Sequence, residues 1–364
     1  MSQSGFEVAR LTVRLGAVAE NYRTCRRLAA GAAVAGVVKA DGYGLGAAEI
    51  AHALLTQGCD TFFVARLEEG IALRPITPKA RIFVLDGVRE QSAAALVEYN
   101  LTPVLNALDE IALWAQTARG RDAAIHIDTG MSRLGLSPTE LAVLAAETGQ
   151  RLAGINPVLV MSHLACADDP SDATNFTQLD RFRAALAQLS PMPASLASSG
   201  GILLGPDYAF DLVRPGIALY GGNPRKGSKN PFGVAARLTG RILQLRRVDK
   251  GESVGYGATF RVERPMTLAT VALGYADGLM RVLGNRGAGA IGGHKVPIVG
   301  RVSMDLVTLD VSDVPAATSG AEVEFLGDTV LLEHVAEAAG TANYEILTAL
   351  GARIPRVYTS ESAP

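Results

Sequence analysis

The chain has 364 residues, enough for two domains, of which 48% are hydrophobic and 19% charged. Its 34 basic and 36 acidic residues leave a formal charge of −2 without any basic block or stripe, which argues against nucleic acid and anionic membranes as partners. The three cysteines, Cys25, Cys59 and Cys166, are scattered and form no Cys-x-x-Cys pair, so they predict neither a disulfide framework nor a metal site.

The first residues, MSQSGFEVARLTVRLG, contain no cationic segment followed by an apolar core and a small-residue cleavage site. We therefore expect no export signal. No apolar run reaches the roughly 18 residues that a membrane span requires, so a membrane protein is not expected either. These features predict a cytoplasmic protein.

The predicted elements begin with a strand-like piece, FEVARLTVRL at 6–15, which precedes a helical stretch at 17–30. Beyond it, short apolar runs of β type alternate with amphipathic helical stretches up to residue 222. Strands are predicted at 34–39, 61–66, 81–87, 101–106, 123–130, 157–164, 193–200 and 211–221. Helices are predicted between most of them, at 47–58, 89–99, 106–118, 137–149 and 175–189.

Eight strands separated by helices are typical of a parallel sheet with crossover helices, and eight is the number that closes a (β/α)8 barrel. An open doubly wound sheet is the alternative, but no Gly-x-Gly-x-x-Gly motif opens a helix here. The piece at 6–15 has no place in this count, so we expect it to join the second domain.

Polar side chains stand at or just past the carboxyl ends of the predicted strands: Lys39, Arg66, Asp86, Asn106, Asp128, His163, Ser199 and Arg214. In a barrel these ends form the rim on which active sites are built. Contact of strand ends with water explains part of this pattern, but less easily an apolar strand that ends in His163. The rim is therefore the predicted site.

After residue 225 the sequence changes character. A linker-like KGSKNPFG leads into longer β-type runs, with helical patterns only at 329–340 and 344–351. We predict a barrel domain at 12–224 and a mostly-β domain at 225–364, the latter joined by the N-terminal segment 1–11.

The strand VAGVVK ends in Lys39 and is followed at once by the glycine-rich turn DGYGLG. A lysine that reaches water from a strand end would explain this stretch taken alone. A semi-buried lysine can also lose its proton, which an arginine cannot, and a neutral amine can attack a carbonyl carbon. The rest of the chain decides between these interpretations.

Six motifs occur in order along the whole chain: VVKADGYGLG at 37–46, DTGMSRLG at 128–135, VRPGIALYG at 213–221, VGYGATF at 254–260, GYADG at 274–278 and VGRVSMD at 299–305. With these motifs the chain resembles the alanine racemase family, bacterial enzymes that depend on pyridoxal 5'-phosphate. The resemblance implies a (β/α)8 barrel, a homodimer with shared active sites, and interconversion of L-alanine and D-alanine. D-Alanine is a peptidoglycan precursor.

The resemblance implies a cofactor site in the barrel. Lys39 would carry the cofactor as a Schiff base, and the phosphate would be bound by Tyr43, Ser199, the amides of Gly216 and Ile217, and Tyr344. Arg214 would face the pyridine nitrogen. Because an arginine accepts no proton, the ring would stay neutral, which suits brief deprotonation better than decarboxylation or transamination.

Racemisation needs a base on each face of Cα, and the resemblance implies Lys39 on one face and Tyr256 of the partner subunit on the other. His163 and Arg214 would tune Tyr256. Judged by spacing alone, Tyr256 would be a structural strand residue. Further implied residues bind the substrate or line the entrance: Arg133 and the backbone of Met304 hold the carboxylate, while Tyr275, Asp305 and Tyr344 lie near the entrance.

Two positions depart from the family pattern. Where many members have a carbamylated lysine that orients the arginine matching Arg133, this chain has His126. Its Ser198-Ser199-Gly200 also lacks an asparagine. Arg133 then needs another negative partner. We expect a bound anion such as chloride, helped by a His126 N–H, with the Asp128 carboxylate as the alternative and a purely structural His126 as a third possibility.

Three other functions are considered. A broad-specificity amino-acid racemase would use the same chemistry, but Tyr275 and Tyr344 match the tyrosines that narrow the family's entrance, which favours alanine. A fold-related pyridoxal-phosphate decarboxylase would be expected to carry a cysteine in its β domain, and no cysteine follows Cys166. A non-enzymatic pyridoxal-phosphate carrier would not need the second domain.

Overall fold

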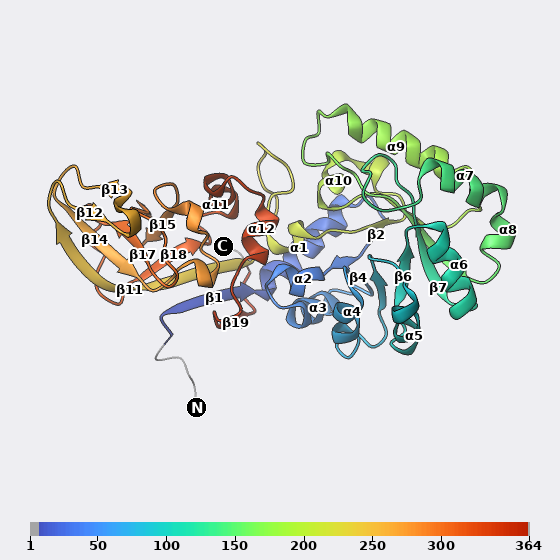
Figure 1. Cartoon of the computed structure of the whole chain (residues 1–364), viewed down its shortest axis with the longest axis horizontal. Helices are drawn as coiled ribbons and strands as arrows, with labels where there is room; N and C mark the ends of the chain where they lie inside the picture. Colours follow the sequence, from blue (N-terminus) through green and yellow to red (C-terminus); the bar gives the residue numbers. More distant parts are fainter. Residues whose placement is uncertain (1–6, 363–364) are drawn as a thin grey trace. The chain divides into compact units, whose positions relative to one another are not determined.

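The computed structural model describes residues 7–362 and divides into two compact units (Figure 1). The β unit comprises Met1–Ala17, Tyr220–Gly222 and Gly233–Pro364. The barrel unit comprises Val18–Leu219 and Asn223–Phe232. These units are defined by contacts, whereas the predicted division at 12–224 and 225–364 concerns independent domains and stays a prediction. Of the segment 1–11 assigned to the second domain, residues 1–6 lie outside the described part.

The barrel unit is built on short parallel strands: β2 Ala33–Val34, β3 Gly36–Val37, β4 Thr61–Val64, β5 Arg81–Val84, β6 Thr102–Leu105, β7 Asp122–His126, β8 Asn156–Met161, β9 Ala194–Ser195 and β10 Leu212–Val213. Strands β3 to β9 form one parallel sheet in chain order, and β10 pairs with β2. The ring closes because β2 continues into β3 after Ala35, and because a parallel bridge joins Ser198 to Arg214. The predicted barrel is confirmed.

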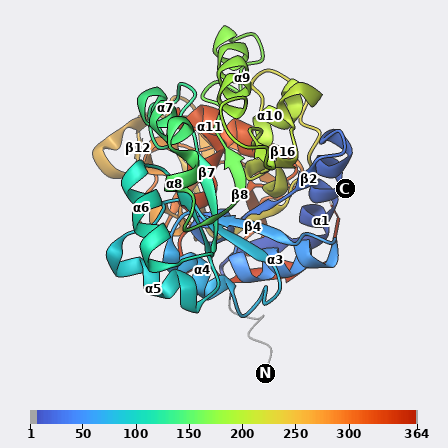
Figure 2. The ribbon, with the colours of Figure 1, turned by 90° about the vertical axis from the view of Figure 1, so that its right-hand side faces the viewer.

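The helices of this unit lie outside the ring of strands (Figure 2). They are α1 Leu15–Leu28, α2 Lys39–Tyr43, α3 Ala47–Thr56, α4 Leu67–Leu73, α5 Glu90–Glu98, α6 Leu108–Thr117, α7 Pro138–Ala146, α8 Thr148–Arg151, α9 Ala173–Leu186, α10 Ser199–Leu204, and the 3-10 turns η1 Pro206–Tyr208 and η2 Ile217–Tyr220. The start of α7 shows why they form where they do. Ser137 and Glu140 cap each other's backbone amides, at 3.3 and 2.9 Å, and Pro138 occupies the first helical position.

The barrel strands read as continuous apolar runs because both of their faces are buried, one inside the ring and one under the helices. Phe62 and Phe63 on β4 are fully buried, and the Phe63 ring stacks on Phe83 of β5 with centroids 4.6 Å apart. Each of the eight predicted strands ends earlier than expected; the largest differences are the run at 211–221, which is extended only to Val213, and 193–200, which is extended only to Ser195. Arg214 therefore directly follows β10, and Ser199 is the first residue of α10.

The β unit contains β1 Ala9–Arg14, β11 Ala236–Val248, β12 Ser253–Val254, β13 Phe260–Arg261, β14 Met266–Val271, β15 Ala288–Ile291, β16 His294–Pro297, β17 Val307–Asp310, β18 Glu322–Leu326 and β19 Arg356–Thr359. Its main sheet has the order β16-β15-β18-β11-β1-β19, and β14 joins β11 to β17. Strand β1 pairs antiparallel with β11 and parallel with β19. The N-terminal strand thus belongs to this sheet and not to the barrel.

The remaining elements of the β unit are short: α11 Leu332–Ala339, α12 Asn343–Thr348, and the 3-10 turns η3 Tyr256–Ala258, η4 Tyr275–Asp277 and η5 Arg281–Leu283. Of the helices that the structure describes, none has both the length and the apolar character to cross a membrane.

Candidate active site

Lys39 lies just past the carboxyl end of β3 and directly before a left-handed turn of the backbone. The four residues Ala40–Tyr43 have φ angles of 52, 53, 62 and 56°, so one full turn is left-handed. Only Gly42 among them adopts this conformation without steric cost. A run of such residues persists only where the surroundings hold it, and such runs are concentrated at functional sites.

Glu69 on α4 is one of the groups that hold this turn. Its Oε1 accepts a hydrogen bond from Ala40 N at 2.7 Å, and its Oε2 accepts from Ala65 N, at the end of β4, at 2.7 Å. The carboxylate therefore ties the residue after Lys39 to the neighbouring strand end. Nothing in the sequence motifs indicated Glu69, although an acidic residue in the first turn of a helix that follows a strand is a signal for amide binding.

The amine of Lys39 is prepared to lose its proton. Burial lowers its pKa from the ordinary value, the Arg133 charge lowers it further, and Glu69 opposes them. A larger neutral fraction makes the amine a better nucleophile and a better base at neutral pH.

Arg214 follows β10 and is almost completely buried. Its Nη1 donates to Ser195 Oγ, and its Nη2 donates to Ser162 O at 2.6 Å and to His163 Nδ1 at 3.4 Å. The guanidinium carbon also lies 5.9 Å from the centre of the Phe63 ring. Burial lowers its pKa to about 10, so it stays cationic at neutral pH.

Among the described residues, no carboxylate pairs with Arg214. Its Nε–H also has no partner in that part of the chain, and this atom is not fully enclosed. One N–H of a fixed, buried cation is therefore available to a ring nitrogen that offers a lone pair. Ser195 and Phe63, which hold this cation, were not indicated by the sequence.

His163 accepts from Arg214 at Nδ1, which places its ring proton on Nε2. Burial first, then the charges of Arg214 and Arg133, lower its pKa to about 3, so the ring is neutral at pH 7. Gln178 on α9 fixes the segment, because its Nε2 donates to His163 O at 3.0 Å and its Oε1 accepts from Ala165 N at 2.8 Å. His163 is thus a neutral donor at the rim.

Backbone amides gather where β9 and β10 end. Ser199 Oγ accepts from Gly216 N at 2.9 Å and from Ala218 N at 3.2 Å. Ile217 N lies between them and donates to no described residue. Any Cβ at Gly216 would overlap the phenol oxygen of Tyr43, so only glycine lets this ring approach. Free and hydroxyl-bridged amides of this kind fit a phosphate group.

Arg133 lies in the loop that follows β7 and is exposed. Within residues 7–362 its guanidinium makes no hydrogen bond or ion pair. Asp128 binds backbone amides instead, since its Oδ1 accepts from the amides of Gly130 at 2.9 Å, Met131 at 2.9 Å and Ser132 at 3.1 Å. In the described residues Arg133 and Asp128 form no ion pair, and Asp128 as the partner of Arg133 stays a prediction.

The site residues of the β unit are mostly on its surface. Tyr256 in η3 is 73% exposed, Met304 53%, Tyr344 45% and Tyr275 41%. Two backbone hydrogen bonds, Tyr275 N to Ser303 O at 2.9 Å and Ala276 N to Met304 O at 3.0 Å, place η4 beside the loop of Met304.

Arg353 fastens this region. Its Nε and Nη2 donate to the two oxygens of the buried Asp277 at 2.6 and 3.0 Å, and its Nη1 contacts Asp305 at 2.8 Å. Asp277 in turn accepts from Gly274 N at 2.8 Å. Asp305 is thus held in place by a residue that the sequence did not indicate, and Asp277 is the part of the GYADG motif that makes the connection.

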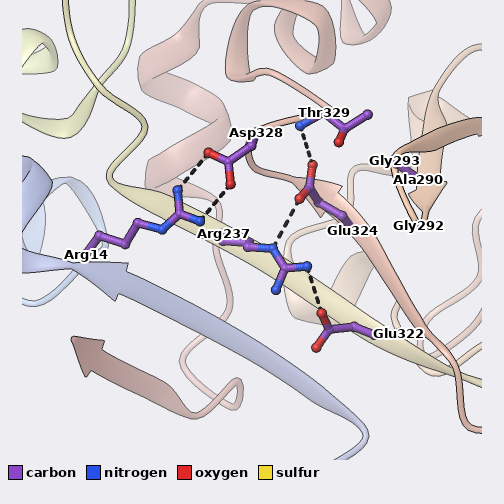
Figure 3. A pocket seen from close by; sticks show the side chains of 9 residues that line it. All are labelled: Arg14, Arg237, Ala290, Gly292, Gly293, Glu322, Glu324, Asp328 and Thr329. Carbon is purple, nitrogen blue, oxygen red and sulfur yellow. Dashed lines mark hydrogen bonds and ion pairs between the residues drawn. The ribbon is translucent and has the colours of Figure 1, made fainter. Parts of the chain in front are cut away.

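A separate cavity of about 520 Å³ lies on the sheet of the β unit (Figure 3). Its charged side chains pair with each other: Arg14 with Asp328 at 2.7 Å, and Arg237 with Glu322 at 2.7 Å and with Glu324 at 3.1 Å. None of the predicted site residues lines it. Because its ion pairs are complete, the cavity is best explained as a structural network.

The structure thus places the predicted residues in two groups. The barrel unit holds one group at its rim: Lys39, Tyr43, His126, Arg133, His163, Ser199, Arg214, Gly216 and Ile217. The β unit holds Tyr256, Tyr275, Met304, Asp305 and Tyr344. In the described part of the chain, no three histidine, cysteine or acidic residues gather so as to hold a metal ion.

Comparison with known families covers nearly the whole chain. The model "Alanine racemase, N-terminal domain" matches residues 13–224, and "Alanine racemase, C-terminal domain" matches residues 235–358. A protein of Rhodospirillum rubrum named alanine racemase is 50% identical over 358 residues, which cover 96% of each chain. A catabolic alanine racemase of Agrobacterium fabrum is 48% identical, with 96% of this chain and 91% of that protein covered.

Among solved structures, the alanine racemase of Bartonella henselae with covalently bound pyridoxal phosphate matches with a TM-score of 0.92 at 40% identity. The match covers 97% of this chain and 99% of that one. The biosynthetic alanine racemase of Pseudomonas aeruginosa matches with the same TM-score at 35% identity.

Proposed function

The chain belongs to the alanine racemase family, and from this premise we propose that it interconverts L-alanine and D-alanine with pyridoxal 5'-phosphate as cofactor. The relatives at 48 to 50% identity carry this activity in their names, and the residues of the barrel rim suit the cofactor. When bound, pyridoxal phosphate draws electrons away from Cα of the amino acid and so makes its proton acidic.

The barrel residues suit each part of the cofactor. The amides of Gly216 and Ile217 with Ser199 and Tyr43 would hold the phosphate, joined by Tyr344 of the β unit. The Arg214 Nε–H would face the pyridine nitrogen, and the Lys39 amine would bind the aldehyde carbon covalently.

A single observation carries the proposal: the buried Arg214 is bound only by neutral groups in the described chain. A cation at the pyridine nitrogen prevents protonation of the ring, which limits the delocalisation of negative charge from Cα. Reactions that profit from long-lived delocalisation, decarboxylation and transamination, are then disfavoured, and rapid return of a proton to Cα is favoured.

Two bases would move this proton. Lys39, with its lowered pKa, serves one face of Cα, and Tyr256 of the partner subunit serves the other. A phenol with an ordinary pKa near 10 needs help to act as a base. His163 would give it, because the ring proton on Nε2 can be donated to the phenol oxygen while Arg214 holds Nδ1.

The exposed β-unit residues support a homodimer with shared sites. Tyr256 is 73% exposed and Met304 53%, which is unusual for groups that carry out or support chemistry. A second copy of the chain would cover them and complete each rim. Arg133 and the Met304 backbone would hold the substrate carboxylate, while Tyr275 and Tyr344 would narrow the entrance to the size of alanine and Asp305 would support it.

We further propose that the enzyme works in the cytoplasm and provides D-alanine, a peptidoglycan precursor. A chiral assay of the purified protein against a panel of L-amino acids tests the function. We expect D-alanine to form faster than any other D-amino acid. Comparable rates with larger side chains would instead support a broad-specificity racemase, and a yellow protein without turnover would support a non-enzymatic pyridoxal-phosphate carrier.

A further inference from the structure

His126 is a buried residue at the end of β7, and its ring is held by a single side chain. Its Nδ1 lies 2.8 Å from Asn106 Oδ1, at the end of the neighbouring strand β6. The amide nitrogen of Asn106 donates to Leu85 O at 3.2 Å and to Val104 O at 2.8 Å. Because both amide protons are bound by carbonyls, the oxygen of Asn106 has to face the histidine.

This arrangement fixes the tautomer of His126. An oxygen at 2.8 Å from Nδ1 requires the ring proton there, which leaves a lone pair on Nε2. Burial, then the charges of Arg214 and Arg133, lower the His126 pKa to about 4, against a smaller opposing effect of Asp128. His126 also contributes to lowering the pKa of His163, which is neutral as well. At neutral pH, His126 therefore presents an acceptor, and its one N–H is taken.

The free edge of the ring faces the loop that carries Arg133. A Cβ at Gly135 would lie 3.2 Å from His126 Cδ2, the atom bonded to Nε2. The base of the loop is fastened to the same strand, since Leu136 N donates to His126 O at 2.8 Å. In residues 7–362 no group hydrogen-bonds His126 Nε2.

Arg133 is a donor that has no partner among residues 7–362. Its charge lowers the pKa of Lys39, His126 and His163, so it lies within electrostatic range of all three. Asp128 is committed to backbone amides. His126 Nε2 is then an unoccupied acceptor that can bind the Arg133 guanidinium.

We infer that His126 is a positioning residue: in the holoenzyme its Nε2 accepts a hydrogen bond from Arg133, a contact that the described residues do not make without the cofactor, and Asn106 fixes the tautomer that makes it possible. The inference rests on the proposed function in so far as Arg133 binds the substrate carboxylate. A neutral acceptor holds the guanidinium without cancelling its charge, which remains available to the substrate. The His126 ring takes the place of the chloride that was expected beside Arg133, because His126 has no free N–H to donate to an anion.

The tautomer can be measured directly by ¹⁵N NMR of histidine-labelled holoenzyme, with His126→Gln to assign the resonance among the five histidines. We expect a protonated Nδ1 and an unprotonated, hydrogen-bonded Nε2 at neutral pH, and a shift of Nε2 towards the unbonded value in Arg133→Leu. A proton on Nε2, or an Nε2 resonance that does not respond to Arg133→Leu, would overturn the inference.

Kinetics separate positioning from a structural role. His126→Leu keeps volume but removes the acceptor, whereas His126→Gln keeps an acceptor. We expect the KM for alanine to rise about 10- to 100-fold in His126→Leu, with kcat changed far less, and to recover largely in His126→Gln. Equal losses in both variants, at equal melting temperature and cofactor content, would contradict positioning by Nε2.

Replacement of chloride by gluconate at constant ionic strength should leave the wild-type rate unchanged, and a fall would favour a bound anion over His126. The NMR result does not depend on turnover. If the protein proves not to racemise alanine while Nε2 still responds to Arg133, the proposed function fails and the contact stands.

Discussion

The two units present their site residues in opposite ways. In the barrel unit, Arg214 and His126 are buried, and each is held by named hydrogen-bond partners before any ligand arrives. In the β unit, Tyr256 and Met304 stand on the surface. Under the proposed function, the first arrangement would be a preorganised cofactor site, and the second would become part of a site when another surface covers it. Loss of Lys39 in the barrel should therefore affect cofactor binding, whereas loss of Tyr256 in the β unit should affect turnover alone.

Lys39→Ala tests the barrel side of this contrast with the largest expected effect. The variant should lose covalently bound cofactor and, with it, roughly 10⁴-fold or more of the racemisation rate, because anchor and base are removed together. Borohydride reduction of the wild-type holoenzyme followed by peptide mapping checks the assignment. Fixation of the cofactor at Lys79 or Lys295 instead would contradict it.

Tyr256→Phe tests the β-unit side. We expect it to keep its yellow cofactor while the rate falls roughly 10²- to 10⁴-fold, since only one base is lost. Mixing it with Lys39→Ala should restore about a quarter of the wild-type activity if subunits exchange at random, because half of the dimers are hybrid and each has one of two sites intact. No recovery despite exchange proven by mass spectrometry would exclude a shared site.

Acid sensitivity should reside in the barrel unit. His126 and His163 have pKa values of about 4 and 3 when folded, below the ordinary 6.5, so the unfolded chain binds more protons between these values. The free energy of unfolding therefore rises as the pH is raised from about 4 to 6.5, and it is lost when the pH is lowered through the same range. His126→Gln should reduce the slope of unfolding free energy against pH by about 1.4 kcal/mol per unit between pH 4 and 6.5. Urea unfolding at several pH values measures this slope. A slope that the substitution leaves unchanged would mean that His126 is not buried as a neutral ring.

Bicarbonate should have the smallest effect of all, namely none. The chain has His126 where many family members carry a lysine that reacts with carbon dioxide, and no carbamate can form on an imidazole that is held by Asn106. Rates in buffer stripped of carbon dioxide and in buffer with added bicarbonate should agree at matched pH and ionic strength. Activation by bicarbonate would point to a carbamylated group elsewhere in the site.

Much of the barrel was predictable because its strands are apolar on both faces and its helices follow at regular spacing. Strands β15 and β19 carry little local signal in the sequence, for a physical reason. The sequence of β15, AGAI, has low strand propensity, and β19 is only half-buried beside β1, with which no local pattern connects it.

The motifs located Lys39, Arg214 and Tyr256, but not the groups that hold them. The contact between His126 and Asn106 follows from the register of β6 and β7, in which Val104 lies opposite Ala124 and Leu105 opposite Ile125. Continued by one residue, this register brings residues 106 and 126 together. Register depends on how two strands meet in the folded sheet, which a single sequence does not state.

The left-handed turn Ala40–Tyr43 has a consequence for the chirality of the backbone itself. Its φ angles near +55° are those that D-residues prefer. Each L-residue is destabilised by roughly 1–2 kcal/mol in this conformation, whereas achiral glycine is not. Position 40 should therefore accept D-alanine better than L-alanine. The junction Gly58–Cys59 allows a synthetic segment 1–58 to be ligated to the rest of the chain, so this can be made. A chain with D-alanine at position 40 should unfold at higher denaturant concentration than the all-L chain, with Lys39 presented as before.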